Sequence, residues 1–171
     1  MRKFRSVDAT IIPTPYRRLN AAIIPAQESG YFLLRTKLID IQDLFFGLFK
    51  ESPYRLASPF EARYDFGRGE IQVCVDVRNG KVFKIIVSEG YRGLLIGKIK
   101  VGMLVREAMA LEPALHYHEP TEIILHRSYP GVGMEVNAID PYAESVPDMR
   151  IAHISVFIPE LDTADGQKGL W

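Results

Sequence analysis

The chain has 171 residues and a mass of 19.4 kDa, with 47% hydrophobic and 25% charged residues, which suits one domain with a core that needs no disulfide or structural metal. Lysine plus arginine (21) equals aspartate plus glutamate (21), so the chain lacks the basic excess of a dedicated nucleic-acid binder or a polybasic membrane anchor. A single cysteine excludes an intramolecular disulfide and a cysteine-cluster zinc site.

The amino-terminal residues are basic, but Pro13 and Pro15 interrupt the apolar run that a signal peptide would need. No apolar run approaches the ~18 residues that a membrane-spanning helix requires. We therefore expect a cytoplasmic protein that does not associate with membranes. In that reducing compartment, Cys74 is expected to stay a thiol packed within a strand.

The first third of the chain predicts little regular structure. Residues 1–30 are expected to be irregular because prolines recur in them, and residues 31–34 form a candidate short strand. Asp40 then suits the start of a helix that ends before Pro53. The apolar residues of this helix recur on one face: Ile41, Leu44, Phe45, Leu48 and Phe49.

The middle of the chain has the pattern of strands. Residues 60–66, 70–78 and 81–88 alternate between apolar and polar side chains. Asn79-Gly80 separates the last two, and this dipeptide between alternating runs is a strong hairpin signal. We expect three antiparallel strands in a meander.

The carboxyl-terminal half continues this mixture of elements. It predicts an extended run at 94–101, a helix at 103–111, strands at 122–126, 134–138 and 151–158, and a loose tail from Pro159 to Trp171. The whole chain is therefore expected to be one α+β domain, residues 1–171, with an antiparallel sheet of about six strands and two short helices.

Charge is unevenly distributed between the two parts of the chain. Residues 1–100 contain 17 basic and 10 acidic residues, whereas residues 101–171 contain 4 basic and 11 acidic residues. An acidic face in the second part would suit a basic partner and would speed the encounter with it. The alternative is an ordinary solvated surface whose two parts attract each other.

The densest set of chemically active side chains is His116, His118 and Glu122. In an extended segment the two histidines point to the same side, and two imidazoles with a carboxylate suit Fe, Mn or Zn. This spacing resembles the first metal motif of the cupin superfamily, whose later histidine ligand has no counterpart in register after Pro130 here. The alternative is a pair of exposed or hydrogen-bonded histidines in a turn.

A longer stretch resembles small bacterial immunity proteins of contact-dependent and other polymorphic toxin systems. It runs from Gly97-Lys98-Ile99 and Gly102-Met103 through Pro130-Gly131-Val132 to Ile151-x-x-Ile154-x-Val156-Phe157. The resemblance implies an inhibitor that covers a toxin's active site or an allosteric surface, with an acidic face against a basic nuclease.

We therefore expect a non-enzymatic binding protein with a protein partner, such as a toxin domain, and with no cofactor. The alternative is a cupin-like metal-binding protein, or a metal-dependent enzyme, that uses this site. No serine-hydrolase elbow or phosphate-binding loop occurs in the sequence, and no catalytic residue is assigned. Loop tyrosines such as Tyr129 and Tyr142 are either binding anchors or lids over the core. The candidate partner-binding residues are Tyr117, Glu119, Glu122, Glu135, Asp140 and Glu144.

Overall fold

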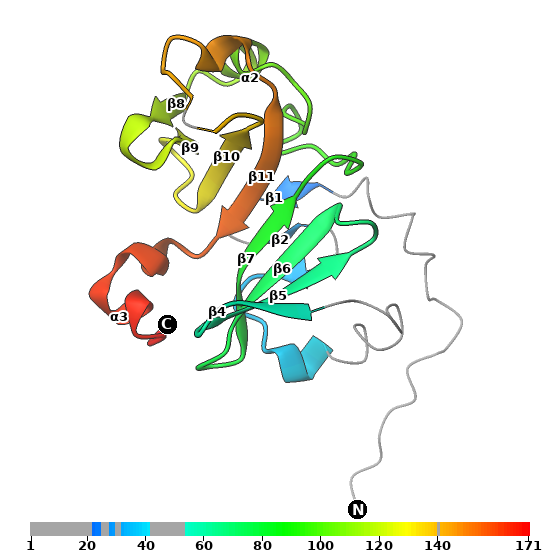
Figure 1. The fold of residues 1–171 in the computed structure, drawn as a ribbon, viewed down its shortest axis with the longest axis vertical. Coiled ribbons are helices and arrows are strands. Elements are labelled where there is room, and N and C mark those ends of the chain that lie inside the picture. Colours follow the sequence, from blue (N-terminus) through cyan, green and yellow to red (C-terminus); the bar gives the residue numbers. More distant parts are fainter. Residues whose placement is uncertain (1–21, 25–27, 30–31, 42–53, 140) are drawn as a thin grey trace, which may run out of the picture.

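A computed structural model describes residues 22–24, 28–29, 32–41, 54–139 and 141–171. Its main feature is an eight-stranded antiparallel sheet with the order β4-β5-β6-β7-β11-β10-β9-β8 (Figure 1). The strands are β4 (Tyr54–Ser58), β5 (Glu61–Phe66), β6 (Ile71–Asp76), β7 (Lys81–Val87), β8 (Leu115–His118), β9 (Ile123–His126), β10 (Val132–Val136) and β11 (Ile151–Phe157). A small second sheet contains β1 (Ile23–Ile24), β2 (Glu28–Ser29) and β3 (Phe32–Leu33).

The predicted hairpin at Asn79-Gly80 is confirmed. Gly80 has a φ of +69°, a conformation that glycine adopts without strain. The side-chain carbonyl of Asn79 accepts a hydrogen bond from the backbone N–H of Lys81 at 2.9 Å, which closes the turn between β6 and β7. Local turn chemistry therefore sets the register of this strand pair.

Strand β11 joins the two parts of the sheet. It pairs with β7 on one side, where Ile154 lies opposite Val87, and with β10 on the other, where Ile154 lies opposite Met134. All three of these side chains are buried, with exposed fractions of 1% or less. The last strand of the chain thus lies between β7, from the middle of the chain, and β10, from its carboxyl-terminal part.

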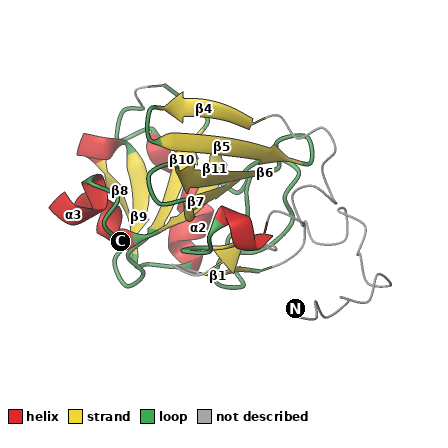
Figure 2. Ribbon diagram, turned by 90° about the horizontal axis from the view of Figure 1, so that it is seen from below, coloured by secondary structure: helices red, strands yellow, loops and turns green. Residues whose placement is uncertain are grey.

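The core lies on one face of this sheet. The helix α2 (Val105–Leu111) contributes Val105 and Ala108 to the same buried cluster as the inward residues of the strands, and β1 contributes Ile23. Figure 2 shows α2 and β1 on the same side of the sheet. The opposite face carries polar side chains, since Glu61, Arg63 and Lys84 alternate with the buried positions.

The predicted α+β class and the antiparallel sheet are confirmed, but the strand number is corrected from about six to eight. Strands β4 and β8 were not predicted, because neither alternates clearly between apolar and polar residues. Residues 94–101 are not a strand: Leu95 and Ile99 form a single bridge around a turn. The helix predicted at 103–111 is confirmed as α2. The helix predicted from Asp40 onward lies mostly outside the described residues. The residues at its start that the structure does describe, 38–41, are helical.

The tail, predicted to be loose, is instead attached to the sheet. It forms the 3₁₀ helix η4 (Pro159–Asp162) and the helix α3 (Ala164–Gln167). Asn79 donates a side-chain hydrogen bond to the carbonyl of Gly169 at 2.9 Å, and the indole N–H of Trp171 donates to the carboxylate of Asp76 at 3.3 Å. The prediction of a loose tail was wrong. The tail is polar, and its hydrogen bonds to Asp76 and Asn79 join residues that are far apart in the sequence.

Of the predicted irregular segment 1–30, the described part contains β1 and β2. Among the described residues, no helix combines the length and the apolar composition that crossing a membrane would require.

Candidate functional site

The predicted partner-binding residues lie near the β8 edge of the sheet and on the loops beside it. Tyr117 is on β8, Glu119 begins the 3₁₀ helix η2 (Glu119–Thr121), and Glu135 is on β10. Glu119, Glu122 and Glu144 are exposed. Asp140 lies outside the described residues. We call the set Tyr117, Glu119, Glu122, Glu135 and Glu144 the acidic surface.

Glu122 and Glu135 line one hollow of about 310 Å³. They come close because Ile124 pairs with Met134, which puts Glu135 across from Ile123, and Glu122 directly precedes Ile123 in the chain. The rest of the lining comes from Thr121, Ile123, Val136, Ala138 and Pro141. Two carboxylates that share a hollow produce a stronger local negative potential than the same charges spread over the surface.

Tyr117 connects this hollow to the following loop. Its hydroxyl donates a hydrogen bond to the carbonyl of Pro141 at 3.2 Å, which holds that part of the loop against β8. Burial raises the pKa of the Tyr117 hydroxyl, and the negative charges of Glu122 and then Glu119 raise it further. The negative charges of these carboxylates therefore disfavour the phenolate form of Tyr117.

Glu122 has an unusual backbone. It ends η2 with a φ of +55°, in the left-handed region where glycine or asparagine is the ordinary choice. Glu135, by contrast, lies within β10 with its side chain 43% exposed and 3.9 Å from the ammonium of Lys84. At this distance and exposure the ion pair is weak, so the charge of Glu135 remains available to a partner.

The structure does not gather His116, His118 and Glu122 into a metal-binding group. The two histidines lie two positions apart on the extended strand β8, but Nδ1 of His118 is 2.8 Å from the hydroxyl of Thr121. Among the described residues, no group of three or more histidine, cysteine, aspartate or glutamate side chains is arranged to hold a metal ion. His126, also near in sequence, pairs across from Leu115 and so lies on the opposite face from His116.

The His126 side chain is buried against a charged pair. Its Nδ1 accepts a hydrogen bond from the backbone N–H of Ser128 at 3.1 Å, and its Nε2 lies 3.7 Å from Glu112. Glu112 is itself paired with Lys98 at 3.0 Å. Burial lowers the pKa of His126 most strongly; Glu112 opposes this effect, whereas His116 and Lys98 add to it.

We expect acidification to destabilise the fold through His126. In the unfolded chain the imidazole takes up a proton near pH 6.5, whereas in the folded chain its lowered pKa keeps it neutral. The free energy of unfolding should therefore fall as the pH drops below 6.5, until the folded pKa is reached. Urea unfolding between pH 7 and pH 5 measures this slope. His126→Gln should flatten it, and an unchanged slope in the variant would contradict the assignment.

The prediction that Cys74 packs within a strand is confirmed. Cys74 is fully buried on β6. Burial, helped by the negative charge of Glu61, raises the pKa of its thiol to about 12. A thiol with this pKa supplies almost no thiolate near neutral pH, so nucleophilic chemistry at Cys74 is disfavoured.

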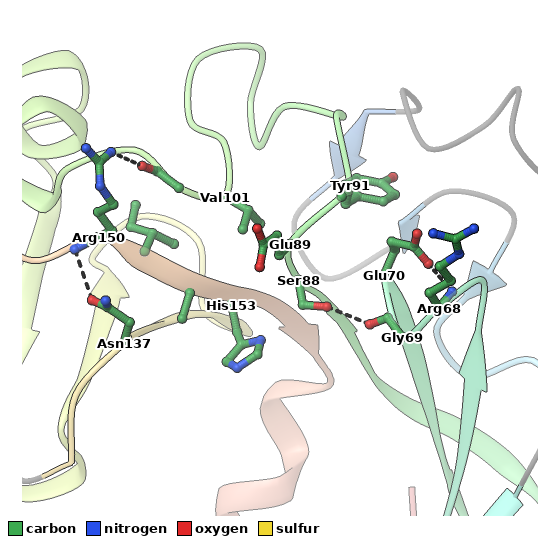
Figure 3. Close-up of a pocket in the computed structure, with 14 residues that line it drawn as sticks. Arg68, Gly69, Glu70, Ser88, Glu89, Tyr91, Val101, Asn137, Arg150 and His153 are labelled. Atoms are coloured by element: carbon green, nitrogen blue, oxygen red, sulfur yellow. Dashed lines mark hydrogen bonds between the residues drawn. The ribbon is translucent and has the colours of Figure 1, made fainter.

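A larger cavity, of about 960 Å³, lies where the ends of β7 and β11 meet the loops around them. Figure 3 shows Arg68 and Arg150 at opposite ends of it, with Ser88 and Glu89 between them. Arg150 donates to the carbonyl of Gly102 at 2.7 Å, and the hydroxyl of Ser88 donates to the carbonyl of Gly69 at 2.6 Å. These polar groups therefore serve the turns around the cavity, and Ser88 is not held as a nucleophile.

No protein-family model and no curated protein matches the chain. The structure is similar to the crystal structure of the uncharacterized protein YfeY from Escherichia coli, with a TM-score of 0.57 over 80% of this chain and 99% of that one. The chain shares the fold of YfeY. Because the two sequences are only 12% identical, the likeness concerns the fold alone, and functional arguments rest on the residues of this chain.

Proposed function

We propose that the protein is a non-enzymatic, cytoplasmic binding protein of the immunity type, which neutralises a basic toxin domain by covering it with the acidic surface. The observation that carries this proposal is the convergence of Glu122 and Glu135 on one hollow. The exposed Glu119, at the start of η2, extends the negative charge beyond Glu122, which follows η2.

The chemistry of the surface fits a partner rich in lysine and arginine. Exposed carboxylates steer a basic partner and set the register of the complex, and like charges on a wrong partner are repelled. Tyr117 packs against the core, and its hydroxyl holds the carbonyl of Pro141, which lines the hollow. The exposed carboxylates of Glu119 and Glu122 also offer acceptors for bidentate arginine contacts.

The proposal is tested by measuring binding to a basic toxin domain, which the immunity hypothesis expects a neighbouring gene to encode. Isothermal titration should give a tight complex with the wild type, and co-expression should protect cells from that domain. The triple variant Glu119→Lys/Glu122→Lys/Glu135→Lys should bind about 100-fold more weakly or worse, because each reversal places like charges in contact. Circular dichroism should show that the variant keeps its strand content.

A matched control carries the same change in net charge elsewhere. Glu89, Asp162 and Asp165 are exposed and lie outside the acidic surface. Reversing these three to lysine should leave the affinity within a few-fold of the wild type. If both triple variants lose affinity equally, net charge rather than this surface governs binding. Wild-type affinity in the Glu119/Glu122/Glu135 variant would overturn the proposed surface.

A further inference from the structure

Two large apolar side chains beside the acidic surface are almost fully exposed. Ile139 has 93% of its surface exposed and Tyr142 has 80%, the two highest values among the exposed large hydrophobic side chains of the described residues. Single exposed apolar residues are common, but two neighbours in one loop, both this exposed, are a feature of interaction sites.

The backbone on both sides of this pair is held in place. Before it, Asn137 and Arg150 exchange hydrogen bonds: the N–H of Asn137 donates to the carbonyl of Arg150, and the N–H of Arg150 donates to the side chain of Asn137, each at 3.3 Å. After it, the carbonyl of Tyr142 accepts from the hydroxyl of Ser145 at 2.7 Å and from its N–H at 2.9 Å. Tyr117 binds the carbonyl of Pro141 between them. The described residues on either side of Asp140 are therefore held by hydrogen bonds, while the two apolar side chains are exposed to solvent.

Acidic groups surround the pair. Pro141 and Ala138, which flank it, line the hollow that contains Glu122 and Glu135, and the exposed Glu144 follows two residues after Tyr142. The nearby Asp148 is already paired with Arg106. Glu135 is weakly paired with Lys84, whereas no ion pair is formed by Glu122 or Glu144 among the described residues, so a partner segment that covers Ile139 and Tyr142 faces the negative charge of these two at the rim.

We infer that Ile139 and Tyr142 are the apolar anchors of the binding interface, and that the partner is a protein segment with an apolar recess bordered by lysine or arginine side chains. This inference rests on the proposed function and specifies the partner for the same surface. Interfaces of this kind take most of their binding energy from a few apolar or aromatic anchors, with charged residues at the rim. Hydrogen bonds that hold the backbone beside the anchors before binding reduce the ordering cost on association.

The experiment uses a phage-displayed library of random twelve-residue peptides as the probe. The library is selected on the wild-type protein after depletion on the variant Ile139→Ala/Tyr142→Ala. We expect the enriched peptides to combine lysine or arginine with leucine, phenylalanine or tryptophan. In fluorescence polarisation, a synthetic peptide from this set should bind the variant about 10-fold more weakly or worse than the wild type.

Controls separate the anchors from exposed apolar residues in general. Leu170 and Tyr54 are 67% and 66% exposed and lie outside the acidic surface. The variant Leu170→Ala/Tyr54→Ala should keep wild-type affinity for the peptide. Raising the salt concentration should weaken, but not abolish, peptide binding, because the rim is charged and the anchors are apolar.

Three results would overturn the inference: no enriched peptide, enriched peptides without basic residues, or equal affinity for the wild type and the Ile139→Ala/Tyr142→Ala variant. Self-association of the wild type in sedimentation, lost in that variant, would also overturn it and assign the anchors to a second copy of the chain. The peptide result does not depend on a toxin. Anchor-dependent peptide binding without any toxin neutralisation would therefore refute the proposed function and leave the partner chemistry standing.

Discussion

Gly131→Ala is expected to lower the free energy of unfolding by about 3 kcal/mol. Gly131 precedes β10 with a φ of +86°, and a Cβ atom at this position would lie 2.2 Å from the backbone carbonyl oxygen of Phe157. The carbonyl of Gly131 also accepts a hydrogen bond from the N–H of Phe157 at 2.8 Å. The added methyl group would thus strain the backbone and push β11 away from the start of β10.

Gly80→Ala is the matched control for the clash. Gly80 also has a positive φ, of +69°, but a Cβ atom there would meet no atom within 4 Å. Its substitution should cost only the backbone strain, about 1 kcal/mol. Guanidinium unfolding of the three proteins measures the difference. Equal losses in the two variants would contradict the close contact between Gly131 and the carbonyl of Phe157.

Asp76→Ala is expected to have the second large effect, a loss of about 3 kcal/mol in the free energy of unfolding. The Asp76 carboxylate is buried at the end of β6, with its side chain 3% exposed. Arg78 donates to both carboxylate oxygens, at 2.9 Å from Nε and 2.7 Å from Nη2, and its backbone N–H donates at 2.9 Å. Trp171 adds the indole N–H. Removing the acceptor leaves these donors without their partner and releases the tail.

The pH dependence of Asp76→Asn isolates the charge. Burial alone raises the pKa of Asp76, but the hydrogen bonds and positive charge of Arg78, with the indole of Trp171, outweigh it and hold the pKa below 3.8. The carboxylate therefore stabilises the fold fully above pH 3.8, and this contribution disappears as the pH falls through the folded value. Wild type and Asp76→Asn should differ in stability at neutral pH and converge in acid. A constant difference would contradict the charge-based account.

Local patterns predicted the hairpin of β6 and β7 because its turn residues and alternation agree. They did not predict β8, whose Leu-His-Tyr-His sequence has no clear period, or β4, whose residues are all exposed. Residues 94–101 show the opposite failure. Ile96 adopts a φ of +47°, which is unfavourable for a β-branched residue, while Leu95 and Ile99 on either side are completely buried. Core packing therefore overrides the strand preference of this segment.

Part of the candidate site could be predicted from the sequence, namely the acidic residues that belong to it. Pairing the predicted strands 122–126 and 134–138 as a hairpin would place Glu122 and Glu135 at opposite ends of the pair; the observed β10 begins two residues earlier, at Val132, and this register puts Glu135 across from Ile123, next to Glu122. The exposure of Ile139 had no sequence signal, because an isoleucine between an alanine and an aspartate is compatible with burial as well. The contacts of Trp171 with Asp76 and Lys81 were also beyond prediction, since nothing in a polar tail identifies its docking position.

The most direct test of the account is the affinity of the wild-type chain for the basic toxin domain expected beside its gene, measured by titration from about 0.05 M to 0.5 M salt. If the acidic surface binds that domain, affinity should be high at low salt and decrease steadily as salt screens the carboxylates, while a residual apolar contribution persists. Absence of binding at low salt, or an affinity that salt does not change, would contradict the account.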